Sequence, residues 1–245
     1  MSRLKDRVIV VTGGASGIGR AAAACCAREG ARVAVVDLDE KGVEGCVMGI
    51  EEDGGQASGF CVDVQDERRV RRLFDEIGQE YTQIDGLVHA AGILEGVLVP
   101  IDEFEELTWD RVIDINLKGS FLMSKYSVPL LEKMGGGVLV LVSSVAGVKG
   151  GSSSVAYGSS KGGVHGLSLV LASQLAGRNI RVHAVCPGAL ATPLKLRQVE
   201  KSAKASGKDF EAAKRALGDP AGVGRVLAWL VSDEAEYVRG TIFTR

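Results

Sequence analysis

The sequence predicts an α/β protein built on a doubly wound parallel sheet. Short, continuously apolar and mostly β-branched segments alternate with longer helical segments along the chain, and a glycine-rich turn follows the first apolar segment. Apolar runs without polar alternation are typical of strands that helices cover on both faces. We therefore expect right-handed crossovers and helices on both faces of the sheet.

The elements can be placed from these patterns and from capping residues. The expected strands are residues 8–12, 32–37, 57–62, 85–90, 137–142 and 180–186, followed by a short strand at 241–244. The expected helices are residues 21–28, 40–52, 66–81, 104–134, 155–175 and 220–230.

Residues 1–245 are expected to form a single domain, because neither an internal repeat nor an interdomain linker interrupts the alternation. Residues 192–218 differ from the rest, since they are rich in Lys, Ala, Glu and Ser and contain only scattered apolar residues. They follow the carboxyl end of a strand, where ligands bind in such sheets. Either a solvated helical excursion or a mobile lid over a substrate pocket accounts for this composition.

The charge balance argues against two classes of partner. The formal net charge is -2, which provides no basic field for nucleic acid or for an anionic membrane surface. No apolar run approaches the roughly 18 residues of a membrane span, and the charged N-terminus lacks the apolar region of a signal peptide. We expect a cytoplasmic protein.

The cysteines and histidines do not indicate a metal site or a disulfide framework. Five cysteines, without any C-x-x-C pair, are expected to act as buried small apolar residues. The three histidines do not cluster and are expected to be packing or surface residues. These residues are Cys25, Cys26, Cys46, Cys61 and Cys186, and His89, His165 and His183.

The glycine-rich turn after the first strand is a candidate phosphate-binding site. It contains Gly13, Ser16, Gly17, Ile18 and Gly19, and it opens the first helix. Glycines let the backbone turn tightly and approach a pyrophosphate, whose charge the helix N-terminus meets. The spacing G-x-x-x-G-x-G is a variant of the dinucleotide fingerprint. The alternative is an ordinary glycine-rich turn between a strand and a helix.

Asp37 at the end of the second strand indicates which dinucleotide binds. A carboxylate there accepts hydrogen bonds from the ribose hydroxyls and repels a 2'-phosphate. Ser16 and Leu38 offer no cation for that phosphate, so the sequence favours NAD over NADP. The alternative for Asp37 is a helix N-cap or loop carboxylate. Asp63 and Val64 follow the third strand and are expected to meet the adenine.

Tyr157 and Lys161 are a candidate acid–base pair. Four residues apart on a helix, the two side chains lie on one face. A tyrosine titrates near pH ~10, and a neighbouring ammonium favours the phenolate. We therefore expect Lys161 to lower the pKa of Tyr157. Alone, such a pair also occurs by chance on solvated helix faces.

With Asn116, Ser144 and the segment 187–192 (Pro-Gly-Ala-Leu-Ala-Thr) added in order, the chain resembles the short-chain dehydrogenase/reductase family. It resembles NAD-preferring members of the 3-oxoacyl-acyl-carrier-protein reductase and glucose dehydrogenase type. The resemblance covers residues 4–245. It implies a Rossmann-like sheet of seven strands in the order 3-2-1-4-5-6-7.

The resemblance also implies catalytic roles. Tyr157 is the general acid in ketone reduction and the general base in alcohol oxidation, and Lys161 tunes its pKa and holds the nicotinamide ribose. Ser144, rather than the neighbouring Ser143, binds the substrate oxygen. Asn116 holds a water that relays protons from Lys161.

Further contacts follow from the same resemblance. The cofactor is expected to touch Ala90, Ala91, Gly92, Pro187, Gly188, Leu190 and Thr192, and the substrate Leu94, Val145, Ala146, Ser154 and the segment after Thr192.

Two departures from the family pattern stand out. His89 and Ala90 replace the usual pair of asparagines, so that contact at Ala90 is through the backbone and His89 is a structural substitute. The family's Asp-Gly-Gly tail is missing after Phe243, which implies a trimmed terminus or an altered subunit contact.

The sequence therefore predicts an NAD(H)-dependent oxidoreductase that interconverts a secondary alcohol and a ketone. An NADP(H)-dependent 3-oxoacyl thioester reductase and a catalytically silent dinucleotide-binding regulator are the alternatives. The resemblance implies a homotetramer or homodimer in which helices 104–134 and 155–176 meet a second subunit.

Overall fold

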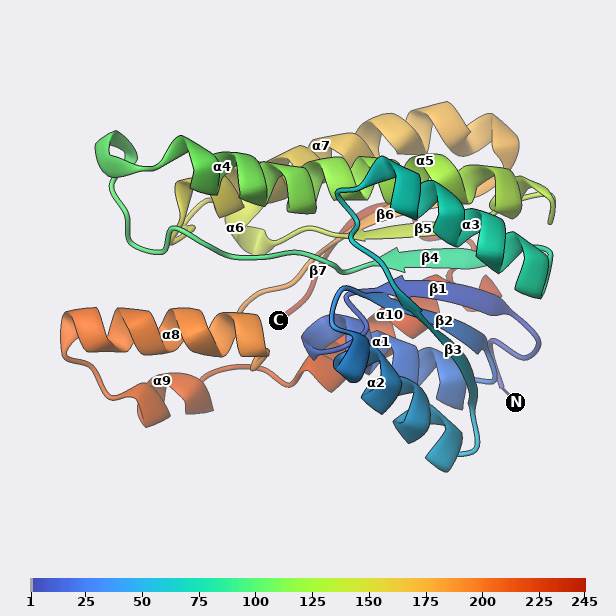
Figure 1. Ribbon diagram of the computed structural model, residues 1–245, viewed down its shortest axis with the longest axis horizontal. Coiled ribbons are helices and arrows are strands. Elements are labelled where there is room, and N and C mark those ends of the chain that lie inside the picture. Colours follow the sequence, from blue (N-terminus) through green and yellow to red (C-terminus); the bar gives the residue numbers. More distant parts are fainter. Residues whose placement is uncertain (1) are drawn as a thin grey trace.

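Seven parallel strands form the centre of the structure, a computed structural model that describes residues 2–245 (Figure 1). The strand order is β3-β2-β1-β4-β5-β6-β7, which confirms the expected fold and order. The strands are β1 Val8–Thr12, β2 Arg32–Asp37, β3 Gln56–Cys61, β4 Gly86–His89, β5 Gly137–Val142, β6 Ile180–Cys186 and β7 Gly240–Phe243.

Helices cover both faces of the sheet and enclose two separate parts of the core (Figure 1). Valines dominate the inner strands, so each of these strands presents apolar side chains to both helical layers. One layer consists of α1 (Gly17–Arg28), α2 (Glu40–Glu52) and α10 (Pro220–Leu230). The other consists of α3 (Glu67–Tyr81), α4 (Glu106–Ile113), α5 (Gly119–Glu132) and α7 (Val155–Leu175).

The prediction of one continuous helix at residues 104–134 is wrong. The chain begins its α-helix only at Glu106 and passes through a π-helical segment, Asp114–Lys118, before α5 starts. A π-helical turn inserts an extra residue into the helix and often marks a functional site. Here the extra residue widens the helix around the buried Asn116.

Smaller differences concern the ends of elements. Helix α1 begins at Gly17 instead of residue 21, because the glycine turn leads directly into the first helical turn. In strands β3, β4 and β7, both ends differ from the expected bounds by one residue. This difference is within the usual ambiguity of element ends.

Cys61 is exposed, so the expectation of five buried cysteines is wrong for this residue. It ends the edge strand β3, whose side chains are only partly covered. The other four cysteines are buried. Within residues 2–245, no group of three or more His, Cys, Asp or Glu side chains is arranged to hold a metal ion.

Residues 192–218 form two helices that extend beyond the sheet (Figure 1). These are α8 (Pro193–Ser206) and α9 (Phe210–Arg215). A parallel bridge between Leu190 and Gly218 closes the excursion at its base. The excursion is therefore helical, as the first of the two interpretations expected.

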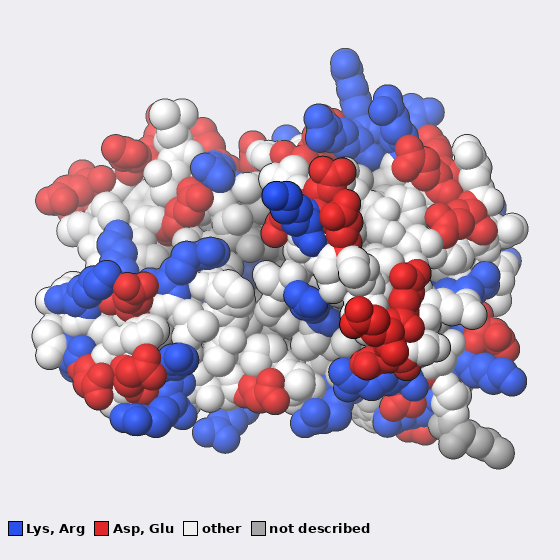
Figure 2. Space-filling model, turned by 60° about the horizontal axis from the view of Figure 1, so that its bottom comes forward, with Lys and Arg blue, Asp and Glu red and all other residues white. Residues whose placement is uncertain are grey.

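The surface carries both signs of charge. Acidic and basic side chains are interspersed on the face shown in Figure 2, as the formal net charge of -2 leads one to expect. Over residues 2–245, the structure contains no helix that is both long enough and apolar enough to span a bilayer.

Candidate active site

A cavity of about 540 Å³ lies at the carboxyl ends of the central strands, where ligands bind in doubly wound sheets. Every residue expected to contact the cofactor lines it, and so do the expected catalytic residues except Asn116. Leu38 lines it too, and so do four residues of the expected segment after Thr192, namely Pro193, Leu194, Lys195 and Gln198. Further lining residues, which the sequence did not indicate, include Ile93, Arg111, Ile115, Val142, Gly150, Gly151, Ser152 and Ser153.

The glycine turn has the geometry of a pyrophosphate site. A Cβ atom added at Gly13 would lie 2.8 Å from the Ala91 nitrogen, and one at Gly19 would lie 2.1 Å from the Gly13 oxygen. The turn therefore requires glycine at both positions. Ser16, the N-cap of α1, makes no side-chain capping bond, so the first N–H groups of the helix remain available to an anion.

The Asp37 carboxylate is held at the edge of the cavity by backbone donors. It accepts hydrogen bonds from the nitrogens of Ala15 at 3.1 Å, Leu38 at 2.7 Å and Asp39 at 3.2 Å. Asp39, not Asp37, caps α2 by accepting from the Gly42 nitrogen. The N-cap alternative for Asp37 is therefore wrong, and its carboxylate lines the cavity.

Asp63 and Val64 form the adjoining wall. Asp63 accepts from the backbone nitrogen and the side-chain amide of Gln65, at 3.1 and 3.0 Å. Val64 is buried and packs against Gly119, where an added Cβ would lie 2.9 Å from a Val64 methyl group. Both residues line the same cavity as the glycine turn and Asp37.

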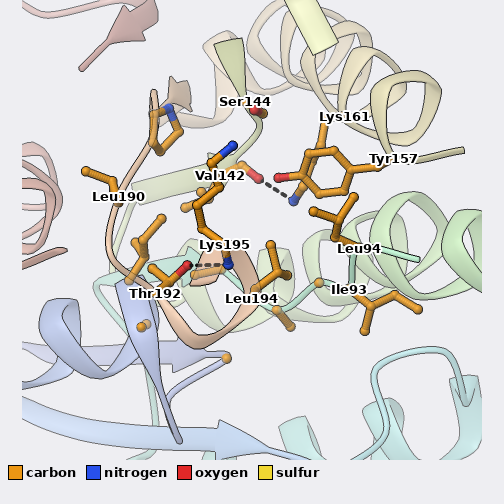
Figure 3. A pocket seen from close by; sticks show the side chains of 18 of the residues that line it. Ile93, Leu94, Val142, Ser144, Tyr157, Lys161, Leu190, Thr192, Leu194 and Lys195 are labelled. Carbon is orange, nitrogen blue, oxygen red and sulfur yellow. Dashed lines mark hydrogen bonds between the residues drawn. The ribbon is translucent and has the colours of Figure 1, made fainter. Parts of the chain in front are cut away.

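Tyr157 and Lys161 lie on one face of α7, as their spacing predicted (Figure 3). The Lys161 Nζ atom is 6.0 Å from the centre of the Tyr157 ring and donates a 2.8 Å hydrogen bond to the Val142 carbonyl. Burial lowers the pKa of Lys161 to about 8. The residue is only 5% exposed.

The expected lowering of the Tyr157 pKa is wrong for this arrangement. Burial raises the pKa of Tyr157, and a hydrogen bond with Ser144 opposes that rise. Because Lys161 points at a backbone carbonyl, the phenol gains less from its charge than the spacing alone suggested. The tyrosine is therefore a protonated phenol at neutral pH.

The two serines after β5 have different roles. Ser143 is buried and donates to the Lys161 carbonyl at 2.7 Å, which fixes the middle of α7. Ser144 lies in the cavity, where its oxygen accepts from the Ala146 nitrogen at 3.2 Å. Since the Ser143 hydroxyl is committed to the backbone, the geometry favours Ser144 for contact with a substrate, as the family spacing implied.

Ser154 does not line this cavity, so its expected substrate contact is wrong. It is buried and caps α7 by accepting from the Tyr157 nitrogen at 3.3 Å. The other three expected substrate contacts, Leu94, Val145 and Ala146, do line the cavity.

The buried Asn116 side chain joins the loop after β4 to α7 through hydrogen bonds. Its Oδ1 atom accepts from the Ile93 nitrogen at 2.8 Å, and its Nδ2 atom donates to the Ile93 oxygen at 3.0 Å and to Ser160 Oγ at 2.9 Å. Both amide protons are thus used. A Cβ atom at Gly92 would lie 3.1 Å from Asn116 Oδ1 and 3.3 Å from Lys161 Nζ, so glycine lets these groups approach.

His89 links the first and fourth strands beside the glycine turn. Its Nδ1 atom lies 2.8 Å from Thr12 Oγ1, which also accepts from the nitrogens of Ala90 and Ala91 at 3.1 Å each. Because those donors occupy the acceptor sites of the hydroxyl, Thr12 donates its proton to His89. Burial lowers the pKa of His89 to about 3, and the charge of Lys161 adds to this. A neutral, buried histidine therefore joins β4 to β1 beside the glycine turn.

The loop after β6 joins the two ends of the cavity. Thr192 caps α8 by accepting from the Lys195 nitrogen at 3.2 Å. A Cβ atom at Gly17 would lie 3.1 Å from a Thr192 methyl group, so the start of α8 packs directly on the glycine turn. Pro187, Gly188 and Leu190 line the cavity along this loop.

Comparison with known proteins agrees with this geometry. The sequence profile described as short chain dehydrogenase matches residues 7–203. The chain belongs to the short-chain dehydrogenase family. It is an oxidoreductase, and members of this family use a nicotinamide dinucleotide.

Relatives of the chain have several activities. The chain is 36% identical to a 3-oxoacyl-acyl-carrier-protein reductase of Thermotoga maritima, over 98% of this chain and 96% of the relative. It is 35% identical to a cyclopentanol dehydrogenase of Comamonas, with the same coverage. The crystal structure of levodione reductase matches with a TM-score of 0.90 and 31% identity, over 98% of this chain and 96% of the other.

Proposed function

We propose that this oxidoreductase interconverts a secondary alcohol and a ketone and that it uses NAD(H). One observation carries the proposal: Tyr157, Ser144 and Lys161 line the same cavity as the glycine turn and Asp37. A dinucleotide in that cavity would have the glycine turn at its phosphates and Tyr157 at its other end.

The residues at the adenosine end fit the cofactor. The free N–H groups at the start of α1 would hold the pyrophosphate, and Asp37 would accept hydrogen bonds from the adenosine ribose. The basic residues that line the cavity are Arg111, Lys161 and Lys195, and none of them belongs to the turn or to the end of β2. This arrangement supports NAD over NADP. The nicotinamide, when bound, supplies or accepts the hydride.

The side chains at the other end supply the proton and the orientation. Tyr157 would donate its phenolic proton to the carbonyl oxygen during reduction. In oxidation it would accept the proton of the hydroxyl as the phenolate, after its own proton has been lost to solvent. Its raised pKa suits the acid role at neutral pH. Ser144 would donate a hydrogen bond to the same oxygen. Lys161, with a pKa of about 8, would carry a positive charge near the tyrosine at neutral pH.

Asn116 would contribute to proton exchange only through an oxygen atom. Both protons of its amide are already bonded to Ile93 and Ser160. A water that relays protons from Lys161 would therefore donate to Asn116 Oδ1 or to a nearby backbone carbonyl.

We also propose that α8 and α9 act as a lid and that the 245 residues work as one cytoplasmic domain in a dimer or tetramer. The first turns of α8 already form part of the cavity wall. Large apolar side chains are exposed on the helices that the family resemblance places at subunit contacts. They are Leu107 on α4, Phe121 on α5, and Leu169 and Val170 on α7.

A second candidate is an NADP(H)-dependent reductase of 3-oxoacyl thioesters. The relative from Thermotoga maritima favours it, whereas the carboxylate of Asp37 opposes a 2'-phosphate.

Turnover with both cofactors decides between the candidates. Purified protein is mixed with NAD or NADP and a panel of secondary alcohols, and with NADH or NADPH and acetoacetyl thioesters. We expect NADH to form from at least one alcohol and NADP to react more slowly. Thioester reduction with NADPH alone would favour the second candidate, and binding of NADH without any turnover would indicate a silent regulator.

A further inference from the structure

Lys195 occupies the part of the cavity that the proposed substrate enters. It lies in the first turn of α8, and its side chain extends across the cavity toward the side where Ser144 and Tyr157 lie (Figure 3). The side chain is partly buried. The residue is bound to the wall only through its backbone, which donates to Thr192 Oγ1.

This lysine has no compensating charge within residues 2–245. Its ammonium is in no ion pair there, whereas Lys204 on the same helix pairs with Glu200 at 2.7 Å. The first turn of α8 contains no acidic residue. A cation at the positive end of a helix is unfavourable for helix stability, so folding of α8 does not explain the lysine.

The two ends of the cavity differ in charge. The acidic residues that line it are Asp37 and Asp63, both at the adenosine end. The basic residues that line it are Lys161, Lys195 and Arg111, and Arg111 already has a carboxylate partner, Glu95, at 3.6 Å. Burial without a nearby carboxylate lowers the pKa of Lys195. Lys161 has no acidic partner within residues 2–245 either, but its ammonium donates to the Val142 carbonyl. Among the three basic residues that line the cavity, Lys195 is therefore the one whose ammonium has neither an acidic partner nor a hydrogen-bond acceptor in the described part of the chain.

We propose that Lys195 binds an anionic group of the substrate, so that the enzyme acts on secondary alcohols and ketones that carry a carboxylate or a phosphate. This inference rests on the proposed function and names its substrate class. An ammonium at hydrogen-bond distance forms a charge-assisted bond with either anion. Lys195 is thus a specificity-determining residue that places the anion on the α8 side of the cavity and the hydroxyl toward Tyr157.

Matched substrate pairs test this proposal. The kcat/KM values are measured for 3-hydroxybutyrate against its methyl ester and for glycerol 3-phosphate against glycerol, in the wild type, Lys195→Met and Lys195→Arg. Lys201→Met, on the exposed side of α8, is the control. The dissociation constant of NADH is measured by fluorescence for each variant.

We expect the wild type to prefer the anionic member of at least one pair. Lys195→Met should lower kcat/KM for that anion by about 10- to 100-fold, the range of a hydrogen bond to a charged group. Kinetics with the neutral partner and the dissociation constant of NADH should stay within about twofold, and Lys195→Arg should restore most of the preference.

Other results would overturn the proposal. Turnover of neutral alcohols without any preference for an anion would remove this inference and leave the proposed function intact. Weaker NADH binding by Lys195→Met, with an unchanged preference, would instead assign the lysine to a cofactor phosphate. Failure of the wild type to turn over any alcohol or ketone would end both proposals.

Discussion

The two ends of the cavity are built in different ways. At the adenosine end, the backbone makes the site, because Gly13 and Gly19 exclude side chains and Asp37 is held by three backbone N–H groups. At the other end, side chains from separate helices make the site, notably Tyr157 and Lys195. From this comparison we expect cofactor recognition to depend on chain geometry, and substrate choice to depend on how the start of α8 packs on the glycine turn.

Substitution of Lys161 should cause the largest loss of activity at the reaction end of the cavity. Lys161→Met removes both the cation near Tyr157 and the donor to the Val142 carbonyl. We expect kcat to fall by about 10²- to 10⁴-fold, the usual contribution of acid–base groups. Steady-state kinetics with saturating cofactor measures this. A fall of less than about tenfold would mean that the charge is not needed for chemistry.

Removal of the charge at Asp37 should affect the adenosine end alone. Asp37→Asn keeps an oxygen acceptor for the backbone donors and removes the repulsion of a 2'-phosphate. The ratio of kcat/KM for NAD to that for NADP should fall by about 10- to 100-fold, with little change in kcat at saturating NAD. An unchanged ratio would show that Asp37 does not select the cofactor.

His89 should make the protein sensitive to acid. The unfolded chain binds a proton on this histidine below a pKa near 6.5, whereas the folded chain does so only near 3. Stability is therefore lost as the pH falls through that window, by about 2 kcal/mol at pH 5. His89→Asn should remove the loss of stability that comes from His89. The loss that comes from His183, whose pKa burial lowers to about 4, should remain in this variant.

Urea unfolding at pH 7 and pH 5 measures the effect of His89. The decrease in unfolding free energy between the two pH values should be smaller in His89→Asn than in the wild type. An equal decrease in both proteins would show that His89 is not buried as a neutral group.

Ser154 should matter for stability more than for catalysis. Ser154→Ala removes the cap that accepts from the Tyr157 nitrogen, which should cost about 1 kcal/mol of unfolding free energy. Because Ser154 does not line the cavity, kcat should stay within about threefold. A large change in substrate KM with unchanged stability would return Ser154 to the substrate site.

Much of the fold and of the cofactor end could be predicted from the sequence. Helix α2 begins and ends where expected, since Asp39 provides a cap and the pattern is regular. The glycine turn was recognisable because only glycine satisfies the close approach at Gly13 and Gly19. Asp37 and Tyr157 followed from their positions relative to strand and helix.

Other features depend on tertiary structure and leave little trace in a single sequence. The π-helical segment around Asn116 is a change in hydrogen-bond register that apolar periodicity does not reveal. Cys61 is exposed because β3 lies at the sheet edge. Lys195 reads as a surface lysine until the start of α8 is seen packed on the glycine turn. The Tyr157 pKa moved opposite to the expectation because burial outweighs a charge that is directed elsewhere.

Tyr157→Phe tests the central claim most directly, because it removes one oxygen atom at the reaction end and leaves the adenosine end intact. Turnover of the best alcohol and the dissociation constant of NADH are measured on the same preparation. The proposed mechanism predicts a fall in kcat of about 10²- to 10⁴-fold, with NADH binding within about twofold of the wild type. Equal turnover in Tyr157→Phe would contradict the assignment of this tyrosine as the proton donor.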